Sequence, residues 1–353
     1  MPETYHLDEL KIELTQECPL ACIHCSTRSN RFMRSRLPLE VVTRILCEAH
    51  ELGARKVALT GGEPLVYPRL LEVLRTASGY SLTTSLYTTG IKDNDLDPID
   101  KSDASSLISS GLGRIIFSVY AARPEIHNAI TGFPSLGPTV VAVQNCIGAG
   151  VHVEFHFVPL RENYLQLGEV VRLAQELNVP KVSVLRFVPH GRGAMIRDTE
   201  ELSPEEYERF GELVQEVSTP GPVQVRLGAP MNMLGISHAC CDAAQDIVVI
   251  DHRGQVFPCD AFKGTDYADR EYGSILHKPL PLVWARSGYL KAARDMHVAR
   301  RNGCASCPTS CMAQEAVRLG GLQNLVHISV AKVPGSSPAL HAGVVEMKVG
   351  SAR

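Results

Sequence analysis

Short apolar segments with strand character alternate with amphipathic helical segments over the first 216 residues. Strands are expected at 9–15, 56–60, 81–90, 113–120, 150–160 and 181–189. The spacing of apolar residues predicts helices at 39–53, 67–77, 102–110, 136–149 and 164–178. Such an order predicts a parallel sheet with right-handed crossovers. Because six strand–helix units are too few to close an eight-stranded barrel, we expect an α/β fold with a partial (βα)6 TIM-like barrel over residues 8–216.

The pattern changes after residue 217. A capping box at Ser203 begins a last helix over 203–217, and the sequence STPGP at 218–222 is typical of a linker. Residues 223–315 hold six clustered cysteines and predict a small second domain. Residues 316–353 contain alternating stretches and predict a short β-rich tail.

Alternation within the strands predicts which side chains face the barrel interior. In 151–157 the apolar set is Val151, Val153, Phe155 and Phe157, which leaves His152, Glu154 and His156 pointing inward. In 113–120 the inward residues are Ser118 and Tyr120, and the same argument applies more weakly to Thr60, Tyr87 and Arg186. Active sites of such barrels lie at the carboxyl ends of the strands. Tyr120, Glu154 and His156 are therefore candidates for proton transfer, the alternative being that they are structural or solvated polar groups.

Composition excludes several classes of partner. The chain has 353 residues, a net charge of −3 and a pI of about 6.5, so no basic field indicates nucleic-acid binding. No run of eighteen apolar residues or charged-then-apolar N-terminal leader is present, so we expect no membrane contact and a cytoplasmic location.

The chain contains eleven cysteines, an unusually high number. In a reducing compartment, so many cysteines more often bind metal than form disulfides. Cys18, Cys22 and Cys25 form a tight CxxxCxxC group directly after the first expected strand. Most iron–sulfur clusters take four protein thiolates, so three would leave one iron open to another ligand. A zinc site completed by His24 is the alternative.

This group, followed by GGEP at Gly61–Pro64 after the second strand, resembles the radical S-adenosylmethionine (SAM) superfamily over roughly residues 8–215. The resemblance implies that the three cysteines hold a [4Fe–4S] cluster whose open iron binds SAM. It implies SAM contacts from Gly61, Gly62, Glu63 and Pro64, with Ser118, Asn163 and Arg186 as weaker candidates.

The chemistry that the resemblance implies is reductive cleavage of SAM to a 5′-deoxyadenosyl radical, which removes a hydrogen atom from substrate. A flavodoxin or ferredoxin would supply the electron. One departure is visible: many relatives end the fourth strand in Ser-x-Asp-Gly, whereas Ser118 here is followed by Val119, Tyr120 and Ala121. The role of that Asp therefore cannot be transferred to this chain.

The second cysteine group resembles the auxiliary-cluster module called SPASM in its full form and twitch in its shorter form. Its members are Cys240, Cys241, Cys259, Cys304, Cys307 and Cys311. The resemblance implies at least one auxiliary [4Fe–4S] cluster on Cys241, Cys259, Cys304 and Cys307, with Cys311 as a competing ligand and Cys240 as a substitute for Cys241. A structural zinc site is the alternative. A spare thiol, Cys240 or Cys311, is a candidate hydrogen-atom donor, whereas Cys47 and Cys146 are expected to be packing residues.

The expected substrate is a small polar natural-product intermediate, carbohydrate-like or an aminocyclitol, which is oxidised or epimerised. Two features favour it: the short cysteine set resembles the twitch form, and only about 17 residues precede Cys18, whereas peptide maturases often carry a leader-binding domain there. The alternative is a maturase of ribosomally made peptides. An alternative of another class is a non-catalytic, metal-stapled scaffold, against which the GGEP segment argues.

Overall fold

The fold is organised by one continuous sheet of nine strands, shown in a computed structural model that describes residues 6–218, 221–228, 231–234, 241–263, 269–300 and 311–313. The strand order is β7-β6-β5-β4-β3-β2-β1-β8-β9. All neighbouring pairs are parallel except β8 and β9. The strands are β1 Glu9–Thr15, β2 Lys56–Gly61, β3 Thr83–Thr88, β4 Leu112–Ser118, β5 Val153–Phe157, β6 Lys181–Val184, β7 Gln224–Leu227, β8 Ile247–Ile250 and β9 Val256–Phe257.

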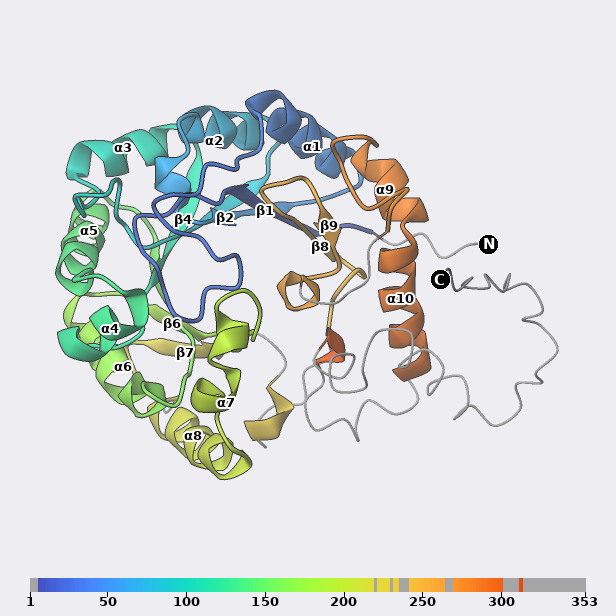
Figure 1. Cartoon of the computed structure of the whole chain (residues 1–353). Coiled ribbons are helices and arrows are strands. Elements are labelled where there is room, and N and C mark those ends of the chain that lie inside the picture. The colour runs from blue at the N-terminus through green and yellow to red at the C-terminus, as the bar shows by residue number, and fades with distance from the viewer. Residues whose placement is uncertain are drawn as a thin grey trace, which may run out of the picture.

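Helices cover the outside of the curved sheet, with α1 to α6 and α8 following its strands in turn and α9 and α10 lying beyond β8 and β9 (Figure 1). This arrangement confirms the expected α/β partial barrel. The α-helices are α1 Leu39–Glu51, α2 Leu70–Gly79, α3 Lys101–Ser109, α4 Pro124–Thr131, α5 Leu136–Gly148, α6 Leu167–Glu176, α7 Arg197–Glu200, α8 Pro204–Val217, α9 Leu280–Arg286 and α10 Gly288–Arg300. None of the described helices is long and apolar enough to cross a bilayer.

Strand alternation separates an apolar outer layer from a polar interior. On β1, Leu10, Ile12 and Leu14 are fully buried in the main core against the helices. The apolar residues predicted to face outward on β4 and β5 lie in the same core. Cys146 is fully buried there as well, which confirms its expected packing role. The interior is thereby left to the other set of side chains, which builds the candidate site.

Three strands of the sheet, β7, β8 and β9, come from the segment that was expected to form a separate small domain. β7 adds to β6, and β8 pairs with β1 in parallel register from Glu9↔Ile247 to Ile12↔Ile250. The sequence DIVVIDHRGQVFPC at 246–259 predicts a hairpin with its turn at HRG, and the structure confirms it: β8 turns back into β9 at Gly254, whose φ of +77° suits glycine. The second cysteine group is thus attached directly to the edge of the barrel. The β-rich tail expected at 316–353 lies outside the described residues.

Glu154, expected to take part in proton transfer, instead lies near the amino ends of the strands in a cluster of cations. Its side chain is 2% exposed and forms ion pairs with Arg114 and Lys181, both at 3.1 Å, and with His152 at 3.4 Å. Although burial opposes ionisation, hydrogen bonding from Lys181 and the charge of Arg114 lower the pKa of Glu154 overall. The carboxylate therefore stays charged, which suits a structural ion-pair centre better than a proton acceptor.

Glu154→Gln should lower the free energy of unfolding at neutral pH by about 2 kcal/mol, because it leaves Arg114 and Lys181 without their shared counter-charge. Since the folded pKa of Glu154 lies below the unfolded value near 4.5, its contribution is present above that pH and is lost as pH falls further. Urea unfolding from pH 7 to pH 3 measures this, with the exposed Glu176→Gln as control. Normal stability with abolished turnover would instead support the proton-transfer role.

Candidate active site

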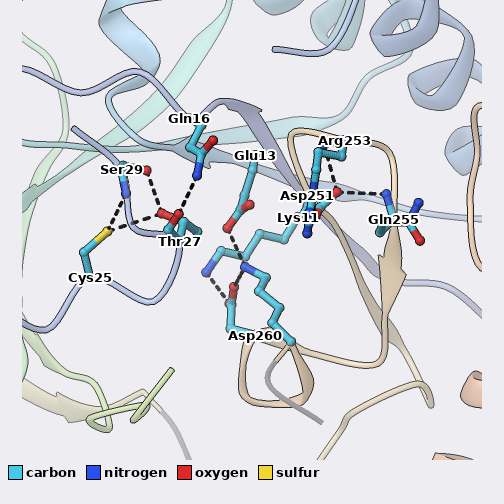
Figure 2. Close-up of polar contacts among 11 residues, drawn as sticks. Lys11, Glu13, Gln16, Cys25, Thr27, Ser29, Asp251, Arg253, Gln255 and Asp260 are labelled. Carbon is cyan, nitrogen blue, oxygen red and sulfur yellow. Dashed lines mark hydrogen bonds and ion pairs between the residues drawn. The ribbon is translucent and has the colours of Figure 1, made fainter. Parts of the chain in front are cut away.

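The three N-terminal cysteines lie on a loop that leaves the carboxyl end of β1. Cys18 is buried and Cys22 and Cys25 are half-buried. The Cys25 Sγ accepts a hydrogen bond from the Ser29 backbone N–H at 3.3 Å and contacts the Thr27 hydroxyl at 3.3 Å. Gln16 donates to the Thr27 carbonyl, which ties the loop to the end of β1 (Figure 2).

The three thiols are close enough to influence one another. Burial, followed by the charge of Cys25, raises the pKa of Cys22 to about 12, and burial and Cys22 raise the pKa of Cys18. Convergent thiolates of this kind are the donor set that iron–sulfur clusters require. No group of three His, Cys, Asp or Glu side chains among the described residues is arranged to hold a single metal ion.

The GGE segment lies against the strand that leads into the cysteine loop. A Cβ on Gly61 would stand 2.3 Å from the Thr15 carbonyl oxygen, and one on Gly62 would stand 2.2 Å from that of Glu17. The Gly62 and Glu63 N–H groups donate to these two carbonyls at 2.6 and 2.8 Å. The glycines are therefore required for close backbone packing, and contact with SAM stays a prediction.

Glu63 is fully buried and its carboxylate is satisfied by the protein. It accepts hydrogen bonds from the Thr88 hydroxyl at 2.5 Å, from the Thr89 N–H and hydroxyl, both at 2.7 Å, and from the Leu65 N–H. Burial raises the pKa of Glu63, and the bonds from Thr88 and Thr89 oppose that shift. The side chain fixes the GGE segment to the end of β3. Pro64 follows as the first residue of a 3-10 turn.

Arg192, which sequence reasoning missed, holds the cysteine loop from the loop after β6. Its guanidinium donates to the Cys22 and Ser29 carbonyls, both at 2.8 Å, and its backbone N–H donates to the Cys25 carbonyl at 2.9 Å. The charge also lowers the pKa of Cys22 against the effect of burial. The adjacent Gly191 in HGRG is the one available sequence signal, since a Cβ there would lie 2.4 Å from the Ser26 carbonyl oxygen.

An aromatic and imidazole cluster lies inside the barrel next to the cysteine loop. The Tyr120 ring contacts His24 at 4.6 Å, His127 at 5.8 Å and His156 at 5.9 Å between centroids, and Tyr87 lies 5.9 Å from His156. The predicted inward direction of Tyr120 and His156 is confirmed. Burial lowers the pKa of His156 to about 3 and that of His24 to about 4, so both rings are neutral at pH 7. The Nδ1 atoms of both rings are buried and have no hydrogen-bond partner among the described residues.

The three weaker SAM candidates have different surroundings. Ser118 lies at the end of β4 and bonds to Tyr120. Asn163 is fully buried, donates to the Tyr120 and Val158 carbonyls and accepts from the Leu160 N–H, so it fixes the loop after β5. Arg186 is buried near Tyr207 on α8, where its charge opposes the burial that raises the pKa of Tyr207 to about 12.

Three thiols of the second cysteine group also converge. Burial, then the charges of Cys241 and Cys311, raise the pKa of Cys259, and burial raises that of Cys241 to about 12 with a further contribution from Cys311. Cys311, expected to compete for the cluster or to donate hydrogen, therefore lies with Cys241 and Cys259. Cys240, Cys304 and Cys307 lie outside the described residues, so their predicted roles are not located.

An ion network joins this second group to β1, with Glu13 and Lys263 buried and Lys11 and Asp260 partly exposed. Lys263 donates to Glu13 and Asp260, and Lys11 donates to Asp260, each at 2.5 Å (Figure 2). Asp260 directly follows Cys259, and the Lys11 ammonium lies 5.3 Å from the Tyr87 ring centroid. Lys11 and Lys263 lower the pKa of Asp260 against the effect of burial. Asp260 therefore lies next to Lys11 and close to the aromatic cluster inside the barrel.

A second connection joins the loop after β6 to the segment after Cys259. The His190 Nε2 lies 2.7 Å from the Ala261 carbonyl oxygen, and His190 is two residues before Arg192. One loop thus contacts both the Cys22 carbonyl and the segment after Cys259. The loop after β6 therefore links the two cysteine groups, and the rings of Tyr87, Tyr120 and His156 pack together in the barrel interior.

Two family models match the chain. Residues 12–174 match the radical SAM superfamily, and residues 240–308 match SPASM, described as an iron–sulfur cluster-binding domain. Together they cover both cysteine groups. Because these domains imply SAM, a [4Fe–4S] cluster at the radical SAM site and auxiliary iron–sulfur clusters, the expected cofactors are confirmed.

Three relatives show how far the likeness extends. The probable GTP 3′,8-cyclase of Thermococcus kodakarensis is 33% identical over 39% of this chain, which spans only 43% of that protein. The PqqA peptide cyclase of Gluconobacter oxydans is 28% identical over 71% of this chain and 70% of its own length. The mycofactocin maturase MftC of Mycolicibacterium smegmatis is 27% identical, covering 84% of this chain and 74% of its own.

The crystal structure of Streptococcus suis SuiB bound to SAM has a similar fold. It superposes with a TM-score of 0.73 at 19% identity, over 90% of this chain and 76% of that one. A likeness at this identity supports the fold, a partial barrel followed by a second domain.

Lys263→Met should destabilise the junction of β1 with β8 by about 3–5 kcal/mol, because the buried Glu13 carboxylate loses its cation. Hydrogen exchange of the amides in 247–257 measures the loss. Adding Glu13→Gln should restore most of the protection, since the pair of Lys11 and Asp260 remains neutral. Lys291→Met, which removes an exposed pair, is the control and should have little effect. Unchanged exchange in Lys263→Met would show that the network does not hold the hairpin.

Proposed function

We propose, from the premise that the chain belongs to the radical SAM superfamily and carries a SPASM iron–sulfur domain, that it modifies a peptide by radical chemistry. The observation that carries this proposal is coverage: the peptide cyclase and the mycofactocin maturase are similar over 71% and 84% of this chain. The GTP cyclase is similar over 39% only. These relatives favour a peptide over the carbohydrate-like substrate expected from the short cysteine set.

Cys18, Cys22 and Cys25 are proposed to hold the cluster that binds SAM. Once reduced, that cofactor pair supplies a carbon-centred radical that takes a hydrogen atom from substrate. The protein buries Cys18, leaves Cys22 and Cys25 half-buried, and fixes their loop through Arg192 and Ser29. Glu63 holds the GGE segment to β3 at the side of the loop.

His156 and Tyr120 are proposed to position the peptide and to donate or accept protons. His156 is neutral and its Nδ1 has no partner, so it can accept a hydrogen bond or a proton from a bound group. Tyr120 stays protonated, because burial raises the pKa of its hydroxyl far above its usual range. Glu154 is not proposed to transfer protons, because its carboxylate forms ion pairs with Arg114 and Lys181.

The second group of thiols is proposed to hold an auxiliary cluster with Cys241, Cys259 and Cys311 among its ligands. Their convergence supports this set, with Cys304 or Cys307 as the remaining ligand. Removal of a hydrogen atom from the peptide can lead to oxidation, epimerisation or cross-linking, and the proposal includes all three outcomes.

Anaerobic reconstitution of wild-type protein should give about eight irons per chain, and a Cys18/Cys22/Cys25→Ala variant about four. The variant should form no 5′-deoxyadenosine, because SAM loses its binding iron. Iron and labile sulfide assays with chromatography of the nucleoside measure both. Retained SAM cleavage in the variant would contradict the assignment of these cysteines. An iron-free variant would show that the second group holds no cluster.

Deuterium transfer distinguishes the substrate classes. The reconstituted enzyme is incubated with dithionite, SAM and either a deuterated peptide library or a deuterated mixture of sugars and aminocyclitols. Deuterium should enter 5′-deoxyadenosine from the peptides only, as mass spectrometry of the nucleoside measures. Transfer from the sugar mixture alone would restore the carbohydrate hypothesis.

A further inference from the structure

We infer that the outer surface of the cysteine loop is the docking face for an acidic protein electron carrier. We call it the arginine face, and it consists of residues 28–36 together with Met195 on the neighbouring turn. The inference rests on the proposed function, because only a protein that cleaves SAM reductively needs an electron at this loop. Per event, the carrier loses one electron and the cluster held by the three thiols gains it.

The charge of this segment departs from that of the whole chain. Residues 28–36, RSNRFMRSR, contain four arginines and no acidic residue, in a chain whose net charge is −3. Arg28 and Arg36 are exposed, and neither forms an ion pair with a described residue. Arg34 is 60% exposed and reaches Glu17 at 3.3 Å. Arg28 and Arg36 are therefore exposed cations without a counter-charge among the described residues, and such cations fit a partner with an acidic surface.

The face also presents apolar side chains among its charges. Phe32 is 79% exposed and Met195 is 81% exposed, the two largest values among the described large hydrophobic residues. Exposed aromatic and methionine side chains surrounded by arginine have the composition of a protein interface. The charge and the apolar centre together indicate a protein partner rather than a small anion.

The segment is held in a defined conformation. The Phe32 N–H donates to the Asn30 side-chain oxygen at 2.8 Å, and the Met33 N–H donates to the Asn30 carbonyl at 3.2 Å. The Arg31 guanidinium lies over the Phe133 ring, 4.4 Å from its centroid. A preorganised surface loses less entropy when a partner binds.

The position of the face relates it to the thiols. The Ser29 N–H bonds to the Cys25 Sγ, and the Cys18 N–H bonds to the Asn30 carbonyl at 3.2 Å. Arg192, just before the turn that carries Met195, bonds to the Ser29 carbonyl. The loop that holds the thiols therefore also forms the face, and a carrier bound there is separated from them by this loop alone. The proposed substrate-positioning rings of Tyr120 and His156 lie instead inside the barrel.

The test measures binding of a reduced bacterial flavodoxin, and separately of a bacterial ferredoxin, to the reconstituted enzyme by surface plasmon resonance. Arg28→Glu/Arg36→Glu should weaken wild-type binding at least about tenfold at 50 mM salt, and 300 mM salt should weaken wild-type binding as well. Phe32→Ser should weaken binding without changing the charge. Arg172→Glu/Arg209→Glu, an equal charge change on the exposed surfaces of α6 and α8, is the control and should leave binding unchanged.

A second readout separates docking from folding and from the proposed function. Formation of 5′-deoxyadenosine should fall in Arg28→Glu/Arg36→Glu when the carrier supplies electrons and stay normal with dithionite. Loss with dithionite, equal weakening in the control variant, or no binding of either carrier to the wild type would overturn the inference. Weaker peptide binding in place of weaker carrier binding would reassign the face to substrate. Absence of peptide modification with intact carrier-driven SAM cleavage would contradict the peptide proposal alone.

Discussion

The position of β1 depends on neutralising charges inside the barrel. Its apolar residues Leu10, Ile12 and Leu14 must face the helices, so strand alternation forces Lys11 and Glu13 to face inward. A buried charge without a counter-charge is costly. Asp260 and Lys263 neutralise both, and they follow Cys259 directly. The same contacts that allow β1 to lie between β2 and β8 therefore bring Cys259 close to the barrel interior.

The sequence predicted what depends on local pattern. The order of strands and helices, the direction of Tyr120 and His156, and the hairpin around Gly254 follow from alternation and turn residues over a few positions, and all agree with the structure. The GGE segment was found by its motif, but the reason for its glycines, packing against Thr15 and Glu17, depends on register between β1 and β2.

What the sequence did not predict depends on contacts between distant segments. Arg192 is one of many arginines until the loop after β6 is placed against Cys22. Glu154 reads as an inward carboxylate, and only the partners Arg114 and Lys181 reveal its structural role. In the same way, the parallel pairing of β8 with β1 follows no local signal, since crossover pairing is set by the whole sheet.

That pairing sets an order of events during synthesis. Glu9 pairs with Ile247, so one edge of β1 lacks this neighbour until the ribosome has made the residues of β8. At about 5–20 residues per second, on the order of 10–50 s separate the two strands. During that interval the nascent barrel presents an open strand edge, the feature through which incomplete sheets aggregate. The iron–sulfur segment, which is made late, thus also covers the edge of β1.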